Sequence, residues 1–342
     1  MDRPPIGVPV SNEPSPAMAK RSFQTHNNIT GGGLLLYLFL FLGIQTCYQV
    51  IEIFKLTMKD PGITSPDRRE EYMETVNKLA MNGVVFIISI VIGIAALCIY
   101  FRKRLPVHDL FVSEQKMTGK TFINIFFIFF AGQAVGQILG VVIEKLLNLM
   151  GMSNAETAKA LEGIFGSPAM ILYATILGPI AEELVFRGFL MRRFQAWGKL
   201  FAIVMTALLF GLFHMNLVQT PYCILIGLVF GYIAMEYGIQ WSIIMHIINN
   251  GALAFGMEML SKAIGEEKSN YIFLAFLGVC LIAGIIILIA NRRKMAEYIS
   301  SNRTERPRYF WAILTPTILI VILLTLAMIL LTLLLSMAAN LG

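Results

Sequence analysis

The chain has 342 residues, of which 57% are hydrophobic and only 14% are charged, and its mean hydropathy is +0.71. Charged residues make up about 25% of ordinary soluble domains, so this composition excludes a typical soluble globular protein and a disordered chain. Runs of about twenty residues with almost no charge have the length of a membrane-spanning helix. The composition therefore predicts an all-α polytopic membrane helix bundle with eight to nine transmembrane helices.

The formal net charge is +6, from 27 Lys and Arg against 21 Asp and Glu. In a membrane protein we interpret this excess as a topology signal, and we expect no nucleic-acid partner. The four cysteines lie inside apolar runs without metal-ligand spacing, so we expect them to be small buried side chains.

Residues 1–30 are rich in proline and polar side chains, which predicts a disordered tail, and residues 31–342 form the predicted membrane domain. Hydropathy predicts nine spans in that domain. A short helix at the membrane interface is expected over 154–166. The spans are expected near 33–54, 79–101, 121–143, 168–191, 200–217, 220–237, 240–261, 271–290 and 312–338.

Alternate loops of this arrangement differ in charge, with 17 Lys and Arg on one side and 9 on the other. The positive-inside rule then predicts a multi-pass protein of the cell membrane with a cytoplasmic N-terminus. Basic loops would also attract anionic membrane lipids.

Polar residues inside apolar spans carry the chemical information, because each costs about 2.5–3.5 kcal/mol at the bilayer centre. They gather in three spans. The fourth span holds Glu182, Glu183 and Arg187, the fifth holds His214, and the seventh holds His246, Asn249 and Asn250.

Glu183 and Arg187 are four residues apart, so they share one face of a helix and are expected to pair. Glu182 then points to a different face without a local counter-charge, which suits a general base. Phe210 and His214 share a face in the same way, as do His246 and Asn250. The alternative for each group is structural: an ion-pair cluster, a hydrogen-bonded core histidine, or a polar clasp between helices.

Together these residues provide a base, a partner to hold water, and hydrogen-bond donors for an oxyanion, which is the equipment of a hydrolase. Glu182, His214 and His246 could alternatively hold one Zn²⁺ with an open position for water. No HExxH pair is present to decide between these two mechanisms.

The order EExxxR (Glu182, Glu183, Arg187), FxxxH (Phe210, His214) and HxxxN (His246, Asn250) resembles the CAAX prenyl protease and bacteriocin-processing family of intramembrane proteases. The resemblance covers about 90 residues within a catalytic core of about 168–255. It implies a water-filled cavity among membrane helices and an endopeptidase that acts on peptides or lipid-modified protein tails. The family has been described as metalloproteases, and a metal-free glutamate mechanism has also been proposed for it.

Carried over by position, the resemblance implies that Glu182 activates water with His214, while His246 and Asn250 stabilise the oxyanion. Glu183, Arg187 and Phe210 would support them. We favour the mechanism that requires no cofactor, with zinc as the alternative. The geometry expected is convergence of the four catalytic side chains within the reach of one water molecule.

Two other functions fit buried Glu, His and Arg residues: a proton-coupled transporter, and a non-catalytic membrane scaffold or immunity factor. The lack of repeated halves argues against the transporter. Because Glu182 lies nearer the basic end of its predicted span, we also expect the site to open toward the basic loops, on the cytoplasmic side.

Overall fold

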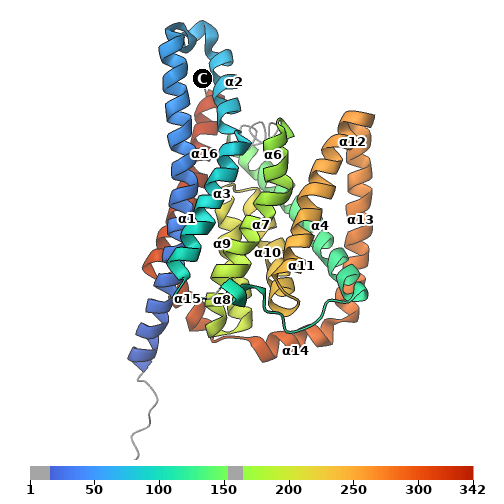
Figure 1. The fold of residues 1–342 in the computed structure, drawn as a ribbon. Coiled ribbons are helices and arrows are strands. Elements are labelled where there is room, and N and C mark those ends of the chain that lie inside the picture. Colours follow the sequence, from blue (N-terminus) through green and yellow to red (C-terminus); the bar gives the residue numbers. More distant parts are fainter. Residues whose placement is uncertain (1–15, 106, 153–164, 342) are drawn as a thin grey trace, which may run out of the picture.

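The computed structural model describes residues 16–105, 107–152 and 165–341, and within these residues it contains helices and no strands. The long helices run up and down along a common direction and form one bundle (Figure 1). Eight of them are long and apolar enough to cross a membrane, and a ninth apolar helix over Lys199–Phe213 is shorter. The predicted all-α polytopic bundle is confirmed.

The first hairpin pairs α1 (Pro16–Lys59) with α3 (Gly83–Phe101). Two short 3₁₀ turns and the polar helix α2 (Arg69–Ala80) connect them at the upper end of Figure 1. The side chain of Asn82 caps α3 by accepting hydrogen bonds from the amides of Val84 and Val85, which satisfies donors that a helix start leaves free.

The predicted disordered tail is wrong for the residues that the structure describes, because α1 begins at Pro16 and includes residues 16–30. Residues 1–15 lie outside the description. Phe23 is buried against Trp197 and Phe201, with ring centroids 4.8 and 5.8 Å away. These aromatic contacts order a segment whose composition alone favours disorder.

Small residues let α1 approach its neighbours closely. A Cβ atom on Gly31 would lie 2.4 Å from Oγ1 of Thr317 in α16 (Pro316–Leu341), and one on Gly33 would lie 2.5 Å from the ring of Phe101. The glycines at the entry to the first span are therefore packing positions that no larger residue could fill without displacing a neighbour.

The loop after α3 contains the 3₁₀ turn Val107–Phe111 and leads to α4 (Gly119–Leu149), which packs against α10 (Gln219–Glu236) and α13 (Glu266–Ala290). Thr118 caps α4 by accepting from the amide of Thr121. The predicted interface helix over 154–166 falls almost wholly outside the described residues.

The central helices carry the candidate residues. The fourth span is α6 (Pro168–Leu172) to α8 (Met191–Phe194), followed by α9 (Lys199–Phe213) and α10. The seventh span comprises α11 (Ile239–Ile247), a π-helical segment (Ile248–Phe255) and α12 (Gly256–Ile264).

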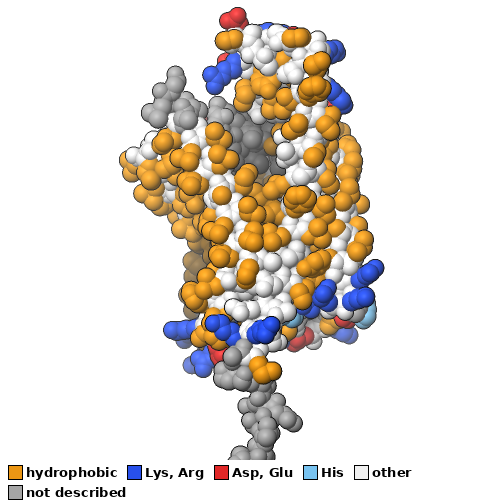
Figure 2. Space-filling view, turned by 90° about the vertical axis from the view of Figure 1, so that its left-hand side faces the viewer, with side chains coloured by type: hydrophobic (Ala, Val, Ile, Leu, Met, Phe, Trp, Pro, Cys, Tyr) orange, Lys and Arg blue, Asp and Glu red, His pale blue; other side chains and the backbone are white. Residues whose placement is uncertain are grey.

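The last elements are α13, α14 (Arg292–Asn302), α15 (Arg306–Ile313) and α16. The described part of the chain begins at the lower end of Figure 1, and its C-terminus lies at the upper end. Hydrophobic side chains cover the middle of the molecule, while charged side chains gather at its two ends (Figure 2). This distribution is what a bilayer-spanning bundle requires.

Candidate active site

The helix that carries EExxxR is not a uniform α-helix. A π-helical segment (Tyr173–Leu177) precedes α7 (Gly178–Glu183), and a second one (Leu184–Leu190) follows it. Pro179 has no backbone N–H and so removes one α-helical hydrogen bond in this stretch. The two glutamates therefore lie at the end of a short α-helical segment between two widened ones, and such widening is frequent at functional sites.

Glu183 is completely buried and is bound by three partners. Its Oε1 accepts a hydrogen bond from Nη1 of Arg187 at 3.1 Å and lies 3.0 Å from Nδ1 of His246. The hydroxyl of Ser242 donates to its Oε2. The predicted contact between Glu183 and Arg187 is confirmed, and it lies at the centre of a larger polar network.

Arg187 is buried with Glu183 and fixes two further elements. Its Nη2 donates to the carbonyl of Gly227 in α10 at 3.2 Å. The guanidinium lies 4.3 Å from the ring centroid of Phe210 and 5.2 Å from that of Phe230. These aromatic faces stabilise a cation that no water reaches.

Glu182 differs from Glu183 in exposure and in its partners. Its side chain is 22% exposed, and its Oε2 lies 3.7 Å from Nε2 of His246. Within the described residues, it forms no ion pair with a lysine or an arginine. Tyr37 of α1 and Tyr173 lie within Coulombic range of its carboxylate. This carboxylate therefore keeps access to a small molecule such as water.

His214 follows the last residue of α9, and Phe210 orients it. Nδ1 of His214 donates to the backbone carbonyl of Phe210 at 2.9 Å, and the two rings meet edge to face at 4.9 Å. With the hydrogen on Nδ1, Nε2 carries a lone pair and is an acceptor. Phe210 also contacts His246 edge to face at 6.0 Å, so the predicted supporting residue bridges both histidines.

His246 stacks on Phe230 with ring centroids 4.7 Å apart and an interplanar angle of 26°. It is bound at Nδ1 by Glu183, which leaves Nε2 directed toward Glu182. One turn later, the amide of Asn250 donates to the carbonyl of Ala174 at 3.1 Å and accepts from Asn249 at 2.9 Å. One N–H of the Asn250 amide remains available.

The structure thus brings Glu182 and His246 into direct proximity and anchors the Asn250 amide to the N-terminal part of the glutamate helix. Among the described residues, no three His, Cys, Asp or Glu side chains are grouped closely enough to hold a metal ion. Glu182, His214 and His246 do not form such a group in the described part of the chain.

Two residues of the network were not identified from the sequence. Ser242 precedes His246 by four residues and so shares its face, a spacing that could have revealed it. Phe230 gives no comparable signal, because nothing local distinguishes it from the other aromatic residues of the spans.

The expectation that the site opens toward the basic loops is wrong. Residues 185–191, which lead from the glutamates to the basic turn, are all buried, as are residues 233–239 at the same end of the bundle. Phe186, Phe189 and Phe194 fill this half. Glu182, His214 and Asn250 retain exposed surface, and we infer from the filled half that the site opens on the side away from the basic loops. The expectation used only the position of Glu182 along its own span, and that position contains no information about aromatic packing from other helices.

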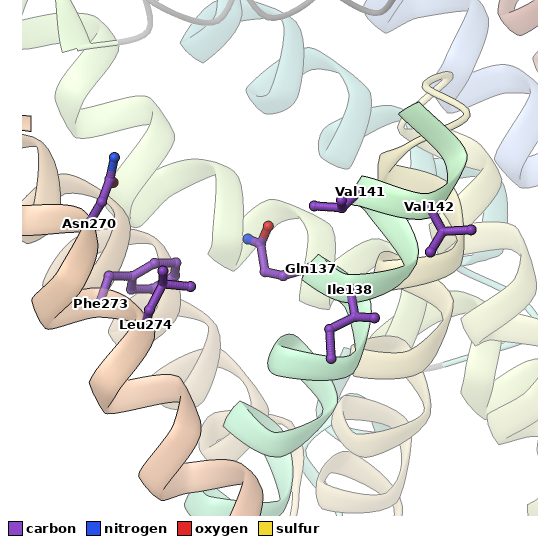
Figure 3. Close-up of a pocket in the computed structure, with 7 residues that line it drawn as sticks. All are labelled: Gln137, Ile138, Val141, Val142, Asn270, Phe273 and Leu274. Carbon is purple, nitrogen blue, oxygen red and sulfur yellow. The ribbon is translucent and has the colours of Figure 1, made fainter. Parts of the chain in front are cut away.

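A groove on the outer surface is separate from these residues. It has a volume of about 510 Å³ and lies between α4 and α13, where Gln137 extends toward Phe273 and Leu274 (Figure 3). None of the candidate catalytic residues lines it.

Comparisons with known proteins bear on the segment that holds the three motifs. The family model described as type II CAAX prenyl endopeptidase Rce1-like matches residues 164–252. Neither the comparison with curated proteins nor that with solved structures finds a match. The matched segment begins before EExxxR and ends after HxxxN. Residues 164–252 of this multi-pass membrane protein are therefore similar to the Rce1-like family, whose general class is that of CAAX-type intramembrane endopeptidases.

Proposed function

We propose that this protein hydrolyses peptide bonds in membrane-associated peptides or lipid-modified protein tails, using a water molecule activated by Glu182. The observation that carries the proposal is the position of the Glu182 carboxylate, which is partly exposed and lies 3.7 Å from Nε2 of His246. The Rce1-like match supports the same reaction class. Prenylated and bacteriocin-type peptides are the substrates to test.

In this mechanism Glu182 accepts a proton from water while the water oxygen attacks the scissile carbonyl carbon. Nε2 of His214 accepts a hydrogen bond from the second O–H of the water, and this bond orients the water molecule. When the C–N bond breaks, Glu182 transfers the proton to the leaving nitrogen, so that a carboxylic acid and an amine are formed and Glu182 is a carboxylate again.

The developing oxyanion requires hydrogen-bond donors. Asn250 supplies the N–H that its bond to Ala174 leaves available. His246 binds Glu183 through Nδ1, so Nε2 donates a hydrogen only when the ring is an imidazolium. Glu183 lies at Nδ1 of this ring and Glu182 faces its Nε2, so each ring nitrogen has a carboxylate beside it.

Glu183 acts as a positioning residue in this proposal. Arg187 and Ser242 hold its carboxylate, and the carboxylate in turn fixes the tautomer and orientation of His246. Partners that orient a functional histidine in this manner have large effects on activity without touching substrate.

If these residues only held helices together, both the Glu182 and the Glu183 carboxylates would be expected to have cationic partners. Glu183 is fully buried among three partners, whereas Glu182 keeps exposed surface and no cationic lysine or arginine partner among the described residues. This asymmetry favours a reactive group over a clasp between helices.

The test is cleavage of fluorogenic prenylated peptides and unmodified membrane peptides by the purified full chain. We expect Glu182→Gln to lower kcat by about 10²–10⁴-fold, because the amide cannot accept the proton from water. Glu297→Gln, the same chemical change on the exposed face of α14, should retain wild-type activity. Equal cleavage by wild type and Glu182→Gln would overturn the proposal, provided that both variants show the same thermal unfolding in detergent.

A further inference from the structure

A second groove, of about 490 Å³, lies at the basic end of the bundle and contains no residue of the candidate active site. It is formed by one face of α1 and by Arg193 of α8. Its polar lining consists of Arg21, Ser22, Thr25, His26 and Arg193. Two guanidinium groups, two hydroxyls and an imidazole therefore face one small volume.

The positive charge of this groove is not neutralised by the described part of the chain. No ion pair joins Arg21 or Arg193 to a carboxylate there. Arg104 lies within Coulombic range of Arg193 and adds charge of the same sign. Uncompensated cations of this kind indicate an anionic ligand.

His26 holds one wall of the groove in place. Because arginine can only donate, Nδ1 of His26 accepts from Nη2 of Arg193 at 3.3 Å. Nε2 therefore carries the hydrogen, and it donates to the carbonyl of Arg193 at 2.8 Å. Trp197 meets the imidazole edge to face at 5.5 Å. The Arg193 side chain is thus fixed before any ligand arrives, which lowers the entropy cost of binding.

The position of the groove along the membrane-spanning helices indicates which kind of molecule supplies the anion. The groove residues lie just before the apolar run of α1, at the end of the molecule where basic side chains gather (Figure 2). Trp197 contacts His26 of the groove, and Trp311 contacts Phe23 of the same helix, with Nζ of Lys20 5.3 Å from the Trp311 ring centroid. Tryptophan and basic residues at the end of a span mark the headgroup layer of a membrane.

We propose that this groove binds the phosphate group of an anionic membrane lipid. The guanidinium groups of Arg21 and Arg193 contact phosphate oxygens, and Ser22 and Thr25 donate hydroxyl hydrogen bonds to them. Ile29 lies in the groove on the side of the apolar run, where it contacts the start of an acyl chain. The inference is independent of the proteolytic function proposed above.

The experiment measures binding of fluorescent phosphatidylglycerol to the purified full chain in a non-ionic detergent. We expect Arg21→Gln and Arg193→Gln each to weaken binding by about tenfold, because each removes a charge-assisted hydrogen bond. Arg292→Gln is the matched control, since it deletes one exposed arginine from α14 at the same end of the molecule, outside the groove. It should bind phosphatidylglycerol as wild type does.

Arg21 is exposed and lacks an ion-pair partner among the described residues, so its variant keeps the proposal testable if Arg193→Gln unfolds. Equal weakening by Arg292→Gln would show attraction to general surface charge and would overturn the site. Unchanged binding in Arg21→Gln would do the same. Inorganic phosphate at millimolar concentration is added as a competitor. If it displaces the lipid and the protein shows no preference for phosphatidylglycerol over phosphate, free phosphate is the ligand and the lipid assignment is overturned.

Discussion

Arg187 shows how a single residue can join three parts of this fold. Its guanidinium binds Glu183 one turn earlier, the carbonyl of Gly227 in α10, and the aromatic faces of Phe210 and Phe230. The spacing of EExxxR predicted the first contact, because residues four apart share a helix face. The other contacts depend on helices that the motif does not include.

We expect Arg187→Met to lower the free energy of unfolding by about 3–5 kcal/mol, because it leaves the buried Glu183 carboxylate without its cation. Arg68→Met is the matched control, since Arg68 pairs with Asp60 and Glu71 at an exposed position. Its free energy of unfolding should stay close to that of wild type, because solvent screens exposed ion pairs. Thermal unfolding in detergent measures both, and an equal effect of the two changes would contradict the role assigned to the buried pair.

At the scale of the element, α4 separates the outer groove from the helices of the site, and glycine sets its distance from α10. The sequence places Gly132 and Gly136 four residues apart, which predicts close helix packing. The structure assigns the contact to Gly136 alone. A Cβ there would lie 2.5 Å from the ring of Tyr222, whereas a Cβ on Gly132 would have no neighbour within 4 Å.

Gly136→Leu should therefore lower the free energy of unfolding by about 1–3 kcal/mol, because the new side chain forces α4 away from Tyr222. Gly132→Leu adds the same side chain one turn earlier, where space is open, and should leave stability within about 0.5 kcal/mol of wild type. Melting temperatures of the two variants test this directly. Destabilisation by Gly132→Leu alone would reverse the assignment of the packing face.

At the scale of the whole molecule, the packing of residues 185–191 and 233–239 predicts that the site opens at the end of the bundle opposite to the basic loops. Cysteine substitution in a chain without its native cysteines tests this arrangement. A cysteine at Asn250 should react with a membrane-impermeant thiol reagent from the same side as one at Glu266, the first residue of α13. Its reactive side should be opposite to that of a cysteine at Lys294 in α14.

The charge count further predicts that the cysteine at Lys294 is protected in intact cells, because the loops on its side of the predicted arrangement carry 17 of the 27 basic residues. Labelling of the Asn250 and Lys294 positions from one and the same side would contradict the position of the opening. Labelling of Lys294 alone in intact cells would reverse the predicted orientation and leave the position of the opening unaffected.

The sequence by itself determined the helical class, the approximate bounds of the spans and the Glu183–Arg187 contact. These features depend on hydropathy along one segment or on spacing within one helix, and both are local. The tertiary structure alone decided the π-helical segments beside the glutamates, the stacking of Phe230 on His246, the order in residues 16–30 and the side on which the site opens. Those features depend on which faces of distant helices meet and on the way in which large aromatic side chains fill the space between them. The sequence of a single helix specifies neither.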